Sequence, residues 1–173
     1  MGMNKGFNAE KAVEVILYII SKGCCNMYNI LKVIYFADKE RLSMVGSTMF
    51  KESYKAMRAG PVPCGSYDML KDVRDCRHHR YDVALPFAFD GDDTNMVYAQ
   101  REPEMGLLSR VDIKCLDNAI AKYGSMPYDN LRNISHRQGD YNAVGLNEWI
   151  PFDALVASVD DEKGTIKSYL KSI

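Results

Sequence analysis

Apolar residues recur at helical spacing along most of the chain, and capping residues, glycines and prolines mark where each run begins and ends. The first run follows Asn8, a residue type that caps helix N-termini, and it stops at Gly23. Apolar side chains surround this predicted helix on most sides. Its narrow polar stripe consists of Lys11, Glu14, Tyr18 and Lys22. A helix with so little polar surface is expected near the centre of the fold.

A second helix is predicted from Met27 to Val45, and Gly46 supplies its stop signal. Residues 50–57 alternate enough to predict a short strand. The run Gly60-Pro61-Val62-Pro63 then predicts a stiff, extended turn, because proline fixes its own φ and restricts the residue before it. A third amphipathic helix is expected over residues 67–76.

The pattern changes towards a period of two in the middle of the chain. Apolar residues at 87 and 89, and at 96 and 98, flank the turn-rich segment 90–95, which predicts a β-hairpin. Ser109 stands three residues before Asp112, an arrangement typical of a capping box. It predicts a helix that runs to Tyr123.

Pro127 predicts the start of a further short helix that carries Leu131, Ile134 and His136. Two more helical segments are expected at 152–159 and 166–173. The pattern as a whole predicts a mostly helical α+β fold, a single domain over residues 1–173, with six to seven helices and one small antiparallel sheet or hairpin.

Composition and charge narrow the class of protein. The chain has 173 residues with 22 Lys and Arg against 23 Asp and Glu, a net charge of −1, which disfavours nucleic acid as a partner. No apolar run approaches the roughly 20 residues of a membrane span, and the N-terminus lacks a signal-peptide pattern. We therefore expect a cytoplasmic protein with no membrane partner, whose five cysteines are reduced.

No catalytic or phosphate-binding motif is present, so no cofactor is expected. Two interpretations are open for Cys64, Cys76, His78 and His79: a zinc site, or buried thiols beside a polar turn; we favour the second and predict no metal. A Cys-His enzyme would use Cys64 or Cys76 with His78, His79 or His136. Two interpretations are also open for the basic cluster of Arg74, Arg77, His78, His79 and Arg80. It is either a solvated turn or the DNA-binding surface of a regulator.

The sequence also resembles a known family in two blocks of residues. The first is the run 30–38 with Gly46, Tyr54, Ala56, the segment 60–63 and Tyr67. The second contains Leu108, Ser109, Asp112, Leu116, Tyr123, Gly124, Leu131, Ser135 and His136 in the same order. Over about residues 8–157 the chain is similar to the Panacea antitoxin domain family, which includes SocA-like proteins and phage-associated GepA-like proteins.

The resemblance implies a non-enzymatic antitoxin of a toxin–antitoxin system that neutralises a cognate toxin protein by direct binding. The alternative is a SocA-like adaptor that delivers the toxin to a Clp-type protease as a further partner. Such binding would bury roughly 800 Å² on each partner, with aromatic and Arg anchors supplying most of the energy. Candidate partner-binding residues lie near the two signature segments: Tyr35, Asp38, Arg58, Pro61, Pro63 and Tyr67.

Overall fold

Two long helices form the centre of the protein, whose computed structural model describes residues 6–159 and 172. Helix α1 (Ala9–Ser21) begins where the Asn8 side chain accepts a hydrogen bond from the Lys11 amide at 3.0 Å. Helix α2 (Met27–Val45) is capped by Asn26 and ends at Gly46, which has φ +76°. Both helices were predicted within a residue or two of these bounds, because the cap residues and glycines are local signals.

Two of the four residues in the predicted polar stripe of α1, Glu14 and Tyr18, are buried, whereas Lys22 is exposed. Glu14 is 3% exposed and pairs with Arg101 at 2.6 Å, and Tyr18 is 4% exposed and donates to Asp117. Helix α1 is therefore central, as predicted, and the middle of its polar stripe is enclosed as well.

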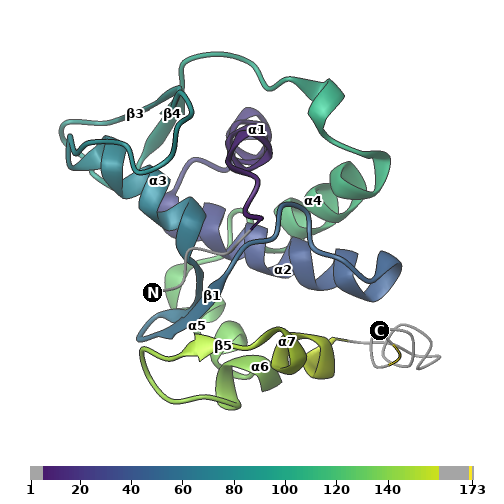
Figure 1. Cartoon of the computed structure of the whole chain (residues 1–173). Coiled ribbons are helices and arrows are strands. Elements are labelled where there is room, and N and C mark those ends of the chain that lie inside the picture. Colours follow the sequence, from purple (N-terminus) through teal and green to yellow (C-terminus); the bar gives the residue numbers. More distant parts are fainter. Residues whose placement is uncertain (1–5, 160–171, 173) are drawn as a thin grey trace.

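Helix α2 is the hub of the fold. It contacts α1, α3 (Cys64–Arg74) and α4 (Arg110–Tyr123) on one side. In Figure 1 these helices lie above α2, and a lower layer lies beneath it. The lower layer contains α5 (Tyr128–His136), α6 (Gly139–Asn142), α7 (Phe152–Ser158) and the strand β5 (Trp149–Ile150).

The strands form two small antiparallel sheets, where the sequence predicted one. The predicted hairpin is present as β3 (Phe87–Phe89) and β4 (Val97–Ala99). The second sheet has the order β2-β1-β5, with β1 (Tyr54–Met57) at its centre and β2 (Gly60–Pro63) beside it. The segment 60–63 is thus a strand, and the prediction of a turn there was wrong.

Proline is compatible with β2 because this strand lies at the edge of its sheet. Val62 pairs with Lys55, and the Cys64 amide donates to the Ser53 carbonyl at 2.9 Å. Pro61 and Pro63 alternate with these residues, so their missing N–H groups fall on the side away from β1. Sequence periodicity does not show this alternation in a four-residue strand with two prolines.

Helix α3 begins at Cys64, three residues before its predicted start. The buried Glu52 carboxylate receives the amides of Gly65 and Ser66 at 2.8 and 2.9 Å, which satisfies the free N–H groups of the first turn. Helix α4 has the predicted capping box of Ser109 and Asp112. The described residues contain seven α-helices and one 3₁₀ turn, η1 (Met105–Leu107); the candidate helix 166–173 lies outside the described residues except for 172.

Gly60 is required where β1 turns into β2, because its φ is +106° and a Cβ atom there would press on the Ser135 side chain and come within 3.0 Å of Lys32 Nζ. We expect Gly60→Ala to lower the unfolding free energy by about 1–3 kcal/mol in urea denaturation. Gly91→Ala is the matched control, since nothing lies within 4 Å of its added Cβ, and should change it by less than about 0.5 kcal/mol. Equal effects of the two substitutions would contradict this role of Gly60.

Candidate partner-binding surface

The β1–β2 hairpin connects the six residues predicted from the sequence to contact a partner. Tyr35 and Asp38 lie on the face of α2 that is turned towards the hairpin, and both are 0% exposed. Pro61 and Pro63 are buried in β2. Arg58 is exposed at the hairpin turn, and Tyr67 is half-buried in α3, directly after β2. A partner that docks on this structure reaches Arg58 and Tyr67, whereas the other four residues shape the hairpin from within.

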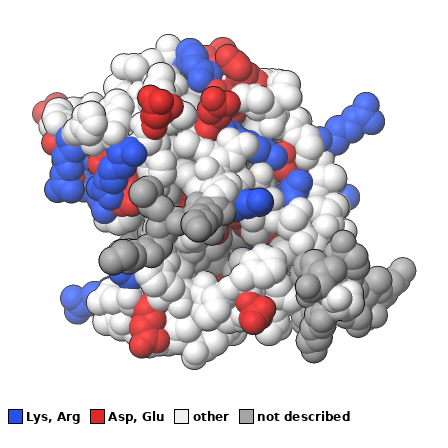
Figure 2. Space-filling model, viewed as in Figure 1, with Lys and Arg blue, Asp and Glu red and all other residues white. Residues whose placement is uncertain are grey.

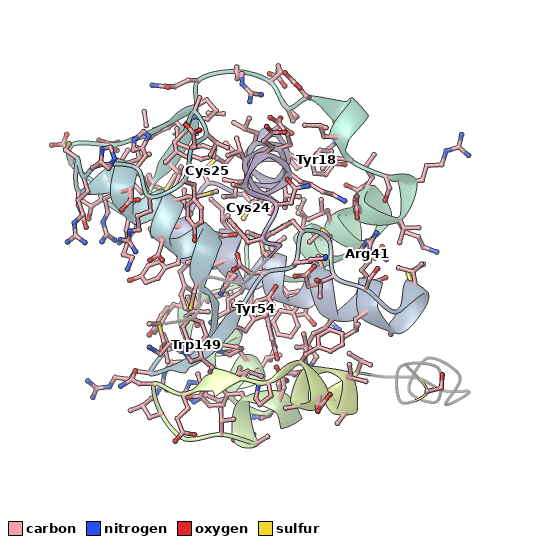
Figure 3. The ribbon with its side chains drawn as sticks, in the orientation of Figure 1. Tyr18, Cys24, Cys25, Arg41, Tyr54 and Trp149 are labelled. Carbon is pink, nitrogen blue, oxygen red and sulfur yellow. The ribbon has the colours of Figure 1, made fainter. Side chains whose placement is uncertain are left out.

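Asp38 holds β1 against α2. Its carboxylate receives the Tyr54 hydroxyl at 2.6 Å and the Met49 amide at 2.8 Å. Burial raises the pKa of Asp38 to about 6, and these two donors oppose the rise. In Figure 3, Tyr54 points from the hairpin towards α2, as this contact requires.

Tyr35 holds α2 to the lower layer. Its hydroxyl is 2.7 Å from both carboxylate oxygens of Asp140 in α6, and the Lys39 ammonium is 2.9 Å from the same carboxylate. Burial raises the pKa of Tyr35 far above its usual value and lowers that of Lys39. This buried cluster of Tyr35, Lys39 and Asp140 ties together segments about 100 residues apart in the sequence.

The turn of the hairpin is clamped through its backbone. Four side chains from α2, α5 and α6 donate to carbonyl oxygens at or next to the turn. The donors and carbonyls are Tyr141 to Met57 (3.0 Å), His136 to Arg58 (3.0 Å), Tyr28 to Ala59 (2.9 Å) and Lys32 to Pro61 (2.6 Å). With so many backbone groups already satisfied, the turn loses little conformational entropy when a partner docks on it.

His136 binds a backbone carbonyl oxygen. The carbonyl belongs to Arg58 in the hairpin, which is a long-range contact. The ring stacks on Tyr141 with centroids 4.7 Å apart. Burial, together with the charge of Arg132, lowers the pKa of His136, so the ring is neutral at pH 7 and donates through Nε2–H.

Trp149, an exposed aromatic residue beside the hairpin, was not among the predicted contacts. It is 41% exposed on β5, and it pairs across the sheet with Lys55, whose Nζ is 5.2 Å from the indole centroid. Figure 3 shows Trp149 at the outer margin of this sheet. The signal that could have found it is that it is the only Trp in the chain and lies between the polar residue Glu148 and Pro151.

The basic residues at the end of α3 are neutralised locally. Figure 2 shows Lys and Arg side chains gathered at the left of the view with acidic side chains among them. The ion pairs are Lys71–Asp68, Arg74–Asp75, Arg77–Asp75, Arg80–Asp68 and Arg80–Asp72. These pairs leave little free positive charge for a phosphate backbone, which favours the solvated turn over the DNA-binding interpretation.

The Cys and His residues are not arranged for nucleophilic or metal chemistry in the part of the chain that the structure describes. Burial raises the pKa of Cys64 to about 12, so the group is a thiol, and it donates weakly to the Val62 carbonyl. Within residues 6–159 no Cys–His hydrogen bond is formed and no three His, Cys, Asp or Glu side chains gather as a metal site. The same residues include no helix long and apolar enough to cross a membrane.

Comparison with known proteins gives one match. The sequence model of the family described as "Antitoxin SocA-like, Panacea domain" matches residues 30–140, more than half of the chain. No curated protein and no solved structure matches. The matched region includes α2 from residue 30 onward, the hairpin, and His136 and Asp140 of the lower layer.

Proposed function

Because the chain belongs to the SocA-like antitoxin family through its Panacea domain, we propose that it neutralises a protein toxin by binding it directly. The family membership gives an antitoxin-type role and a protein as the kind of partner. The finer proposal is that the toxin is blocked in a stoichiometric complex in the cytoplasm, without catalysis or a cofactor on the antitoxin side.

The observation that supports this proposal most is that the matched region includes the exposed hairpin turn and two of the four side chains that clamp it, Lys32 and His136. Lys32 and His136 fix the backbone of the turn from which the exposed Arg58 side chain extends. Preorganised Arg and aromatic side chains are the residue types that anchor protein interfaces. Antitoxin action by surface binding fits this arrangement better than turnover of a substrate.

Co-expression with the product of each adjacent open reading frame tests the proposal. We expect one neighbour to arrest growth alone, and growth to return when this chain is co-expressed, with both proteins purifying together at 1:1. Growth that returns while the neighbour's level falls, and only in cells with a Clp-type protease, would identify the adaptor mechanism instead. The proposal is overturned when no adjacent product is toxic or bound by this chain.

A further inference from the structure

Positive charge without a local partner gathers around the hairpin turn. Three cations surround it: Lys55 in β1, Arg58 at the turn, and Arg132 in α5, close enough to His136 to lower that residue's pKa. Within the described residues none of the three forms an ion pair with a carboxylate. The Lys and Arg side chains at the end of α3, by contrast, all form ion pairs.

Two exposed aromatic side chains flank the same turn. Trp149, 41% exposed, lies beside Lys55 on one flank. Tyr128, 51% exposed, lies on the other flank, where its ring packs 4.6 Å from Tyr28, whose hydroxyl binds the Ala59 carbonyl. Each side of the clamped turn thus has one aromatic and one cationic side chain, Trp149 with Lys55 on one side and Tyr128 with Arg132 on the other. We name these five residues the hairpin-tip surface: Lys55, Arg58, Tyr128, Arg132 and Trp149.

We infer that the hairpin-tip surface binds an acidic segment of the toxin, an inference that rests on the proposed function. Carboxylates of that segment pair with the three cations, none of which is paired with a carboxylate within residues 6–159. Its apolar side chains cover Trp149 and Tyr128, which supply contact area with few rotors to immobilise. Charge complementarity selects an acidic occupant, because a basic segment would meet three like charges.

A protein segment is favoured over nucleic acid for two reasons. Three cations are a small footprint for a polyanion, since nucleic-acid binders neutralise many phosphates at once. The chain as a whole has a net charge of −1, so long-range attraction to a phosphate backbone is absent. Short-range pairing with a few carboxylates does not need a net positive molecule.

The single tryptophan makes the occupancy of this surface directly measurable. Trp149 is the only Trp in the chain, so its emission reports on the hairpin-tip surface alone. Two probes are titrated into the full chain: a tryptophan-free, glutamate-rich peptide with interspersed leucines, and single-stranded DNA of equal charge. The inference predicts a shift in Trp149 emission with the acidic peptide that weakens as salt is raised, and a smaller response to DNA.

Charge-reversal variants assign the binding to specific cations. Lys55→Glu and Arg58→Glu are expected to weaken peptide and toxin binding by about tenfold or more, and to abolish growth rescue together. Arg77→Glu is the matched control, because it makes the same charge change at a cation that is already paired with Asp75. It should change affinity by less than about twofold. Arg58→Gln, which removes the charge without reversing it, gives an intermediate loss and guards against misfolding of the reversed variants.

The outcomes separate this inference from the proposed function. Rescue and complex formation that survive in Lys55→Glu/Arg58→Glu, or toxin binding that leaves Trp149 emission unchanged, would overturn the surface while direct neutralisation stands. Tighter binding of DNA than of the acidic peptide would make nucleic acid the occupant and overturn the inference. Where no neighbour is toxic, the proposed function fails, and the peptide titration alone decides whether the surface recognises acidic segments.

Discussion

Asp140→Ala is expected to lower the unfolding free energy by about 3–5 kcal/mol, because it would leave the Lys39 ammonium buried without its carboxylate and the Tyr35 hydroxyl without its acceptor. Asp140 is 0% exposed, so water does not replace it. The loss also frees α6 from α2. Chemical denaturation followed by far-ultraviolet circular dichroism measures the change, and growth rescue should weaken in parallel.

Asp153→Ala is the matched control for Asp140→Ala. Asp153 lies in the first turn of α7, in the same lower layer, and its side chain is exposed. Asp153→Ala should lower the unfolding free energy by no more than about 1 kcal/mol, because it removes only the favourable interaction of the carboxylate with the helix dipole. Adding Lys39→Met to Asp140→Ala should recover part of the stability, because the uncompensated buried charge is then removed as well. Equal losses for Asp140→Ala and Asp153→Ala would show that the buried cluster contributes nothing beyond a surface carboxylate.

The elements that the sequence predicted well are those with local signals. Asn8, Gly46 and Ser109 act within one helical turn of their own positions, and the helices beside them have the expected bounds. In the three-stranded sheet, β1 lies within the strand predicted over residues 50–57, but β2 and β5 lack such signals. β5 has only two residues, and β2 owes its place to an edge position that depends on a partner strand. Short elements of this kind are decided by tertiary contacts.

The candidate site was less predictable, because its polar residues are satisfied across long distances in sequence. Tyr35 was expected at the surface on the basis of the family signature, but its acceptor Asp140 is 105 positions away and encloses it. Lys32 is likewise satisfied at long range, since it donates to the Pro61 carbonyl from a buried position. Hydrophobic periodicity predicts that polar residues on one side of a helix form a solvent-exposed face. When distant segments supply hydrogen-bond partners, the same polar face can be buried. Residues that carry a family signature can therefore serve the fold rather than contact with a partner.

Lys32 is expected to make the unfolding free energy rise with pH between about 7 and 10. Its side chain is 1% exposed and has no carboxylate partner within the described residues, and burial lowers its pKa to about 7. In the unfolded chain the pKa returns to near 10.5. Between these values the unfolded chain binds more protons, so each added pH unit stabilises the fold by up to about 1.4 kcal/mol. Below pH 7 the amine is charged in both states, and its contribution is constant.

The comparison of the native chain with Lys32→Met isolates this effect. Lys32→Met also removes the bond to Pro61, but that offset does not change with pH, so the slope of the unfolding free energy between pH 7 and 10 is the quantity to measure. The native slope should exceed that of Lys32→Met, while Lys114→Met, at an exposed position, should match the native slope. Burial raises the pKa of Cys24 and Cys64 to about 12 and that of Cys115 to about 11, so these thiols oppose the rise from about pH 9. Tyr28, whose pKa burial raises to about 12, opposes it above pH 10. These contributions are common to all three proteins and cancel when their slopes are compared. Parallel slopes for the native chain and Lys32→Met would mean that Lys32 stays charged in the fold, and the hairpin would then be held by an ammonium rather than by a neutral amine.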